Sequence, residues 1–184
     1  MKRSHLLIGI IFLILIIDQS LKIYIKTNYS IAGGFDILGL SWAKIHFVEN
    51  EGMAFGLKFG GVIGKYILSI FRIGMVAFLI YFLREMIKSK ESIGLQISFA
   101  LIIAGAIGNI IDSAFYGMIF SNSGYHAGVA TLFPEGGGYA PFLQGKVVDM
   151  FYFPMINTHF PEWFPFWGGE RFQFFRPVFN VADS

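Results

Sequence analysis

Three long apolar stretches divide the chain, and we expect them to form membrane-spanning helices over about residues 5–25, 62–83 and 93–120. Each stretch approaches the ~20 residues that a helix needs to cross the hydrocarbon core of a bilayer. The third stretch is rich in alanine and glycine, and such small residues let membrane helices approach closely. The pattern predicts an all-α membrane bundle, with residues 1–184 as a single integral membrane domain.

The first stretch could instead be a cleavable signal peptide, because Lys2 and Arg3 precede its apolar run. Against this interpretation, no small-residue cleavage site follows the run. The polar residues Asp18, Gln19 and Lys22 come next, and further apolar residues follow them. We therefore interpret the stretch as a retained membrane helix.

Basic residues indicate how the three spans are oriented. Lys2 and Arg3 precede the first span, and Arg84, Lys88 and Lys90 lie between the second and the third. Three consecutive spans place both groups on one side, which the positive-inside rule assigns to the cytoplasm. Segments 26–61 and 121–178 are then expected on the outer side of the membrane.

The two outer segments differ in character. Residues 42–48 alternate weakly between apolar and polar, between glycine pairs that are typical of turns, so a small β-element is expected there. The second segment is rich in glycine, proline and aromatic residues. Its Trp163, Phe164, Phe166 and Trp167 are typical of an amphipathic segment at the membrane–water interface.

Composition narrows the possible chemistry. Hydrophobic residues make up 55% of the chain and charged residues 14%, whereas soluble domains carry about a quarter charged residues. The absence of cysteine excludes disulfides and a thiol nucleophile. No two of the four histidines have the i, i+4 spacing of a helical metal pair, so no metal site is expected. A net charge of +2 without a basic run gives no support for nucleic-acid binding.

Ionisable and amide side chains inside the predicted spans are costly in a bilayer and are candidates for function. Asp18 and Lys22 have i, i+4 spacing, so they share a helix face, and a structural ion pair is the favoured interpretation. Asn109 and Asp112 have i, i+3 spacing on the third span. They could form a hydrogen-bonded knot between helices or position a substrate, and the sequence leaves both open.

Two further acids, Asp149 and Asp183, lie near the predicted outer boundary of the membrane, and Asn180 precedes the second by three residues. Each acid taken singly could cap a helix. Taken together they suggest aspartic-protease chemistry, because neighbouring carboxylates share a proton. One then serves as a base toward water while the other, protonated, polarises a carbonyl. Spacing alone does not show that the two acids meet.

Five motifs in order along the chain resemble those of the lipoprotein signal peptidases (signal peptidase II), in the form found in Bacteroidetes. They are Asp18 with Lys22, Asn50-Glu-Gly-Met-Ala-Phe55, Gly108-Asn-Ile-Ile-Asp112, Val147-Val-Asp-Met-Phe151 and Phe179-Asn-Val-Ala-Asp183. Each motif alone is weak, but five in order from end to end are specific.

The resemblance implies Asp149 and Asp183 as the catalytic pair. It implies that Asn109, Asp112 and Asn180 line the substrate pocket, that Asn50 and Gly52 belong to a loop that contacts substrate or inhibitor, and that Asp18 and Lys22 are the polar pair of the first helix.

The implied activity is removal of the signal peptide from a prolipoprotein, just before a cysteine that carries diacylglyceryl. No cofactor is needed. The expected partners are such lipobox substrates, membrane lipid and globomycin-like inhibitors. The expected location is the bacterial inner membrane, as a multi-pass protein with its site near the periplasmic face.

The chain departs from the family pattern in three places. Ser113 stands where the motif usually continues with arginine, and the segment between Asp112 and Asp149 is longer than usual. The sequence ends at Ser184, so the family's fourth helix is expected to be missing and the chain to be inactive or nearly so.

Two other functions compete with the peptidase. One is a small proton-coupled carrier with Asp18, Asp112 and Asp149 as relay groups, and the other is a membrane scaffold without catalysis. The absence of internal repeats counts against a carrier.

Overall fold

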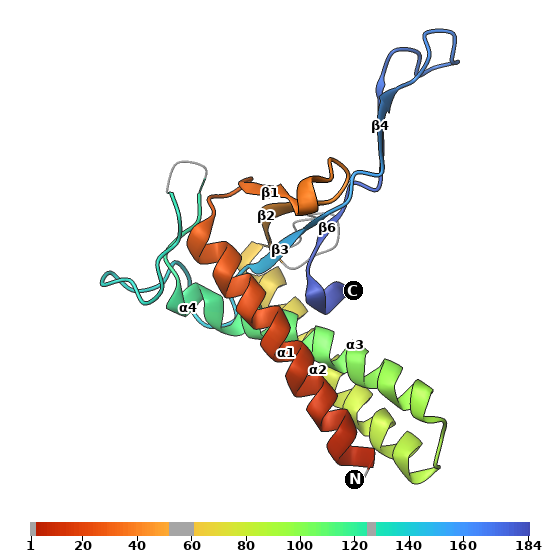
Figure 1. Ribbon diagram of the computed structural model, residues 1–184. Coiled ribbons are helices and arrows are strands. Elements are labelled where there is room, and N and C mark those ends of the chain that lie inside the picture. Colours follow the sequence, from red (N-terminus) through yellow and green to blue (C-terminus); the bar gives the residue numbers. More distant parts are fainter. Residues whose placement is uncertain (1–2, 52–60, 125–127) are drawn as a thin grey trace.

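The computed structural model describes residues 3–51, 61–124 and 128–184, and three long helices run alongside one another in it (Figure 1). Their bounds are α1 Arg3–Asn28, α2 Gly61–Lys88 and α3 Ile93–Ile111. By length and composition α1 and α2 can each cross a membrane, and so can α3 together with its continuation to Ile119. At ~1.5 Å per residue, each is longer than the ~30 Å hydrocarbon core.

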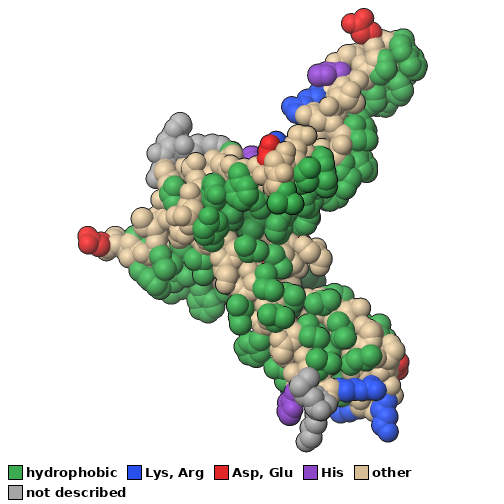
Figure 2. All heavy atoms as spheres, in the orientation of Figure 1, with side chains coloured by type: hydrophobic (Ala, Val, Ile, Leu, Met, Phe, Trp, Pro, Cys, Tyr) green, Lys and Arg blue, Asp and Glu red, His purple; other side chains and the backbone are tan. Residues whose placement is uncertain are grey.

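Many large apolar side chains of these helices, above all on α1 and α2, point away from the protein. Phe12, Ile63 and Phe78, for example, are each more than half exposed. Hydrophobic side chains accordingly cover much of the visible surface of the bundle (Figure 2). Exposed apolar area costs about 25 cal/mol per Å² in water, so this surface requires a hydrocarbon environment. The predicted membrane bundle is confirmed in its three long apolar helices.

α3 packs against both of the other helices, as its small residues predicted. Its buried face includes Ala100, Ala104, Gly105 and Gly108. These residues allow neighbouring backbone to approach closely, which matters for the site described below.

The start of α1 lies beside the connection between α2 and α3. The Arg3 guanidinium donates a hydrogen bond to the Glu91 carbonyl oxygen at 3.1 Å. Lys and Arg side chains gather at this end of the bundle (Figure 2). Arg3 and the basic residues between α2 and α3 therefore lie on the same side, as the orientation argument requires.

The outer end of α3 changes its helical geometry. A π-helical turn, η3 Asp112–Tyr116, follows α3, and a short helix, α4 Gly117–Ile119, completes the span. Asp112, Ser113 and Tyr116 are buried in this turn. Such wider turns are uncommon and frequently occur at functional sites.

A four-stranded antiparallel sheet sits at the outer end of the bundle, with strand order β1-β2-β3-β6 (Figure 1). The strands are β1 Gly34–Asp36, β2 Lys44–Asn50, β3 Val147–Tyr152 and β6 Val178–Phe179, and a 3-10 turn, η1 Ile37–Gly39, follows β1. β2 confirms the predicted β-element. Its pairing with β3 joins the first outer segment to the second, which the sequence did not predict.

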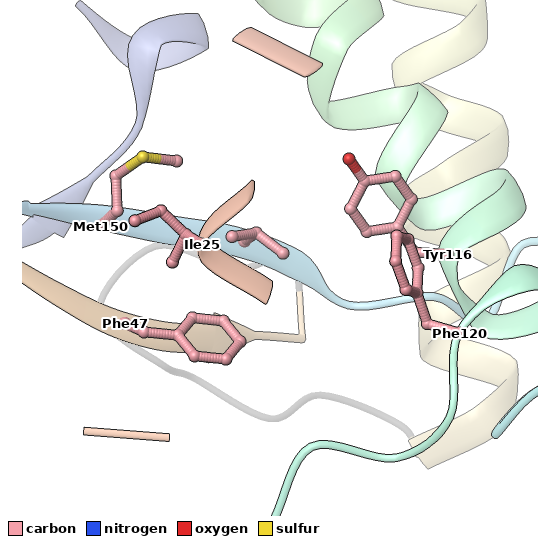
Figure 3. Close-up of a cluster of buried hydrophobic side chains, with 6 residues drawn as sticks. Ile25, Phe47, Tyr116, Phe120 and Met150 are labelled. Carbon is pink, nitrogen blue, oxygen red and sulfur yellow. The ribbon is translucent and has the colours of Figure 1, made fainter. Parts of the chain in front are cut away.

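An apolar cluster joins the sheet to the helices (Figure 3). Ile25 from α1 and Phe47 from β2 pack with residues of the α3 extension and β3, namely Tyr116, Phe120, Val148 and Met150. Their burial fixes β3 against the bundle, because each large side chain removed from water stabilises the contact by about 1.5–3 kcal/mol.

A buried ion pair reinforces this contact. Lys26, near the end of α1, is fully buried and pairs with Glu49 of β2. Its ammonium also donates to the Ser123 hydroxyl at 2.7 Å and lies 5.1 Å from the centre of the Tyr139 ring. The pair thereby connects α1, the sheet and the long second outer segment.

A second β-structure lies apart from the sheet. β4 Ile156–His159 and β5 Arg171–Phe174 form a two-stranded hairpin that projects away from the rest of the molecule (Figure 1). After β6 the chain turns back toward α3 and forms a 3-10 turn, η4 Val181–Asp183.

Candidate active site

Asp149 lies in the middle of β3, directly opposite Val48 of β2. Its side chain is almost fully buried, although a carboxyl group needs polar partners when it is removed from water. The Asn180 amide donates to Asp149 Oδ1 at 2.7 Å, and the Asn50 amide donates to Oδ2 at 3.3 Å. Both oxygens therefore have a partner, one from each side of the strand.

Asp183 reaches the same place from η4, and its side chain is exposed. The Asn109 amide of α3 donates to Asp183 Oδ1 at 2.9 Å, and Asn180 donates to Asn109 Oδ1 at 3.2 Å. Two asparagines thus join the two aspartates in one chain of hydrogen bonds, in the order Asp149, Asn180, Asn109, Asp183. The structure brings together four of the residues that the sequence singled out.

The surroundings of Asp149 raise the pKa of its carboxyl group. Burial, followed by the negative charge of Asp183, raises the pKa of Asp149 from its ordinary value of 3.8 to about 7. The hydrogen bonds from Asn50 and Asn180 oppose this rise. Asp149 therefore holds a proton well above the pH at which an ordinary carboxyl group loses it.

Lys22 lies beneath the pair and organises the polar side chains of α1 and α3. Its fully buried ammonium is 2.9 Å from Asp18, 2.8 Å from Asp112 and 2.9 Å from Asn109 Oδ1. An ammonium has three donors, and all three find an acceptor here. The expected pairing of Asp18 with Lys22 is present, and Lys22 also links Asn109 to Asp112.

Asp18 and Asp112 each hold a backbone amide next to one of the aspartates. Asp18 Oδ1 accepts a hydrogen bond from the Ala182 amide at 3.1 Å, and Asp112 Oδ2 accepts one from the Val148 amide at 3.3 Å. Ala182 precedes Asp183, and Val148 precedes Asp149. The two buried carboxylates therefore position η4 and β3 through the backbone.

Gln19 completes this buried layer. Its amide donates to Asp112 Oδ1 at 2.9 Å, and its own Oε1 accepts from the Tyr116 hydroxyl at 3.1 Å. The sequence analysis gave Gln19 no role. Its position three residues before Lys22, in an otherwise apolar span, is the signal that could have identified it.

Two glycines of α3 make room for η4. A Cβ atom at Gly105 would lie 2.0 Å from the Ala182 carbonyl oxygen, and one at Gly108 would lie 2.7 Å from Asp18 Oδ2. Only glycine fits at these two positions without a shift of backbone or of a buried carboxylate. The small residues of α3 thus serve the approach of Asp183 to Asn109.

Comparison with known proteins identifies the class of this site. A sequence model of the family described as Signal peptidase (SPase) II matches residues 10–184. The chain belongs to the signal peptidase II family. Members of this family cleave the signal peptides of prolipoproteins, so membership confirms the activity class that the five motifs predicted.

Relatives agree along the whole chain. A lipoprotein signal peptidase of Porphyromonas gingivalis is 49% identical over 185 residues, which cover 100% of this chain and 79% of that protein. One from Amoebophilus asiaticus is 35% identical and covers 99% of this chain and 73% of its own length. The relative from Porphyromonas, a Bacteroidetes genus, supports the subgroup that the motifs suggested.

Solved structures support the fold. A bacterial membrane enzyme matches with a TM-score of 0.59 and 23% identity over 97% of this chain and 79% of its own. A second structure of a bacterial membrane enzyme gives a TM-score of 0.57 and 24% identity, covering 97% and 83%. The helical bundle with its small sheet is thus an architecture already observed in a membrane enzyme.

Ser113, which departs from the common signal peptidase II motif, is buried against the chain that leads into β3. Its hydroxyl donates to the Asn109 carbonyl oxygen at 3.0 Å, and its own carbonyl oxygen accepts from the Gly145 amide at 2.8 Å.

Arg72 of α2 supplies a positive charge near the site from another helix. Its electrostatic interaction is strongest with Asp183 and weaker with Asp112 and Asp149. The sequence analysis did not include it among the site residues, although an arginine within an apolar span is itself a functional signal.

Two other expectations concern the loop after β2 and metal binding. Gly52 lies outside the described residues, whereas Asn50, two residues before it, contacts Asp149. Within residues 3–51, 61–124 and 128–184, no group of three or more histidine, aspartate or glutamate side chains could hold a metal ion.

Proposed function

We propose that the chain is a membrane aspartic endopeptidase that removes the signal peptide from diacylglyceryl-modified prolipoproteins, with Asp149 and Asp183 as its catalytic pair. The observation that carries the proposal is the hydrogen-bonded chain from Asp149 through Asn180 and Asn109 to Asp183. The test is processing of a prolipoprotein by the full chain in a bilayer, compared with the aspartate variants discussed below.

The two aspartates have different roles in the proposed mechanism. Asp149, buried and with a raised pKa, keeps its proton and donates it to the oxygen of the scissile carbonyl. Asp183, which is exposed, takes a proton from water as the water oxygen attacks the carbonyl carbon. When the tetrahedral intermediate collapses, the proton on Asp183 passes to the departing nitrogen. Asp149 then recovers its own proton, so water is the only other reactant and no cofactor enters.

The surrounding residues divide into substrate contacts and positioning residues. Asn50 and Asn180 hold the Asp149 carboxyl group, and Asn109 holds that of Asp183. We assign Asn50, Asn109 and Asn180 to the substrate pocket, with Gly52 in the adjoining loop. Asp112, with Asp18 and Lys22, lies fully buried below them, so we assign Asp112 a positioning role.

The pH dependence of cleavage follows from the proton on Asp149. Because the pKa of this acid is raised to about 7, we expect kcat/KM to fall as the pH rises through about 7. Asn180→Ala removes a hydrogen bond that lowers the pKa of Asp149. In this variant the fall of kcat/KM should therefore occur at higher pH, and the maximum rate should be lower. Rates measured between about pH 5 and 9 test this. A wild-type profile that is flat across neutrality would contradict it.

The depth of the site supports catalysis within the outer half of the membrane. Gly105, which contacts the residue before Asp183, lies 12 residues after the start of α3 at Ile93, or roughly 18 Å along the helix. The hydrocarbon core measures ~30 Å. A site at this height would lie in the outer half of the core.

We place the protein in the bacterial inner membrane, with the sheet and the catalytic pair toward the periplasm. The basic residues at the opposite end of the bundle support this orientation. In a chain without cysteine, a single Lys88→Cys substitution can be labelled selectively. We expect an impermeant thiol reagent to reach it only from the cytoplasmic side, and labelling from outside intact cells would overturn the orientation.

The proposed partners follow from the same activity. They are prolipoproteins with a diacylglyceryl cysteine, the surrounding lipid, and globomycin-like peptides that would compete for the position between Asp149 and Asp183. Competitive inhibition of prolipoprotein cleavage by such a peptide tests the last of these.

A further inference from the structure

The β4–β5 hairpin is an amphipathic ribbon. In its register Ile156 pairs with Phe174 and Thr158 with Phe172, whereas the alternating positions pair as Asn157 with Gln173 and His159 with Arg171. Cross-strand partners share a face and successive residues alternate between faces, so one face is apolar and the other polar. Figure 2 shows hydrophobic side chains along one side of the projecting arm and basic side chains on the other.

The apolar face continues into an aromatic tip. The ring of Phe160 stacks on that of Phe164 with 4.9 Å between the ring centroids, and its centroid lies 5.0 Å from that of Phe172. Beyond this stack, Trp163 and Phe166 are 79% and 95% exposed. Phe166 also has a φ of +69°, a left-handed conformation that bulky residues rarely adopt. The tip thus holds a large ring outward at a strained backbone position, without burying it in the protein.

The ribbon has no protein surface to rest on among the described helices and strands. None of them covers either of its faces in Figure 1. An isolated two-stranded hairpin is marginally stable in water and needs a further apolar surface. The hairpin leaves the sheet at the outer end of the bundle, at a wide angle to the axes of α1, α2 and α3, and points away from these helices (Figure 1). The apolar surface available there is the bilayer that the same helices require.

The two legs of the hairpin lead directly into the catalytic strands. β3, which carries Asp149, ends at Tyr152, and β6, which precedes Asp183, begins at Val178 opposite it. At the base of the hairpin the Gln173 amide donates a hydrogen bond to the Tyr152 hydroxyl. A change in the orientation of the hairpin would therefore move β3 and β6 as well.

We propose that residues 153–177 form a membrane-docking arm, whose aromatic tip and apolar face insert into the outer-leaflet interface. Tryptophan and phenylalanine favour this boundary, and the polar face with Arg171 faces the aqueous headgroup region. Docking orients β3 and β6, and so Asp149 and Asp183, toward a substrate anchored in the same leaflet. This second consequence rests on the proposed function, whereas the docking itself does not.

Fluorescence measures the docking directly. The full chain with Trp42→Phe and Trp167→Phe keeps Trp163 as its single tryptophan. In vesicles of phosphatidylethanolamine and phosphatidylglycerol, we expect lipids brominated near the headgroup to quench Trp163 and aqueous iodide to be excluded from it. The matched control replaces all three tryptophans with phenylalanine and carries His159→Trp on the polar face, which iodide should reach. Trp163 quenched by iodide as strongly as the control would overturn the proposal.

Activity measures the consequence of docking. The triple variant Trp163→Ser, Phe166→Ser, Trp167→Ser should lose at least about tenfold in kcat/KM in bilayers, because three aromatic side chains lose their apolar contact. Asn157→Ser with His159→Ser, on the polar face, should cleave at the wild-type rate. If the triple variant does not fold, Phe166→Gly still tests the tip, because glycine accepts the positive φ.

The two assays separate this inference from the proposed function. Cleavage that needs Asp149 but is unchanged in the tip variants, with Trp163 in water, would overturn the docking arm and leave the peptidase intact. Lipid quenching of Trp163 in a chain that cleaves no prolipoprotein would establish docking and overturn the peptidase.

Discussion

Replacing either Asp149 or Asp183 with asparagine is expected to reduce prolipoprotein cleavage by at least about a hundredfold, since a positioned general acid or base contributes about 10²–10⁴ to the rate. Asparagine keeps the shape and can still accept the hydrogen bonds from Asn180 or Asn109. It cannot take a proton from water or return one to a carbonyl oxygen. The measurement is the single-turnover cleavage rate of a diacylglyceryl-modified substrate by matched amounts of folded enzyme.

Asp36→Asn is the matched control, because it makes the same chemical change at an exposed site on β1, where Asp36 pairs with Lys44 at 2.9 Å. It should cleave at the wild-type rate. Cleavage above about a tenth of the wild-type rate, a barrier change of less than roughly 1.4 kcal/mol, in either catalytic-pair variant would reject the two-aspartate mechanism.

Lys22→Met is expected to have the largest effect on stability, a loss of about 3–5 kcal/mol, because it leaves buried carboxylates without their counter-charge. Lys22, Asp18 and Asp112 are all nearly or completely buried, so water cannot replace the lost ammonium. Activity should fall as well, since Asp18 and Asp112 hold the backbone beside Asp183 and Asp149. The measurement is the unfolding midpoint in mixed detergent and sodium dodecyl sulfate.

Two further variants sharpen this result. Lys44→Met breaks an ion pair that is about one-third exposed and should cost less than about 1 kcal/mol. Combining Lys22→Met with Asp18→Asn and Asp112→Asn removes the uncompensated charges, so this chain should be more stable than Lys22→Met alone. An unchanged midpoint for Lys22→Met would show that the fold does not depend on the buried network.

The parts of the structure that the sequence could predict are those encoded locally. Apolar runs of sufficient length identified the three helices, and their predicted bounds differ from the observed ones mainly where amphipathic ends extend the first two helices. Asp18 and Lys22 lie one helical turn apart, so their contact followed from spacing alone. The same reasoning placed Asn109 and Asp112 on one face, and Lys22 contacts both.

The contacts that spacing could not predict join distant segments. Asp149 and Asp183 come together because β3 pairs with β6 at Phe151 and Phe179, and both strands lie in an aromatic segment without a clear alternating pattern. The family resemblance, rather than periodicity, therefore identified the pair. Strands of two to six residues are too short for a periodic signal to stand out.

Two local hypotheses were displaced by tertiary contacts. Asp149 lies in a strand, so it does not cap a helix. Asp183 lies inside η4 and does not cap it; Asn180 occupies the cap position, and its side chain bonds Asp149 and Asn109 rather than the backbone of the turn. Lys26 and Glu49 belong to different elements, and nothing in either segment alone indicates that they form a buried pair.

Because of the π-helical turn at Asp112–Tyr116, the side chains of the third span before and after the turn do not follow one regular helical register. An α-helix advances by about 100° per residue, and a wider turn holds one more residue, so the residues after it are rotated relative to those before it. Before the turn, Asn109 donates to Asp183, and at its end Tyr116 packs in the core beneath the sheet. One continuous span thereby contributes both to the site and to the core beneath the sheet. Natural variation in this segment is therefore expected to preserve which side chains face the site and which face the core, more than the length of the segment.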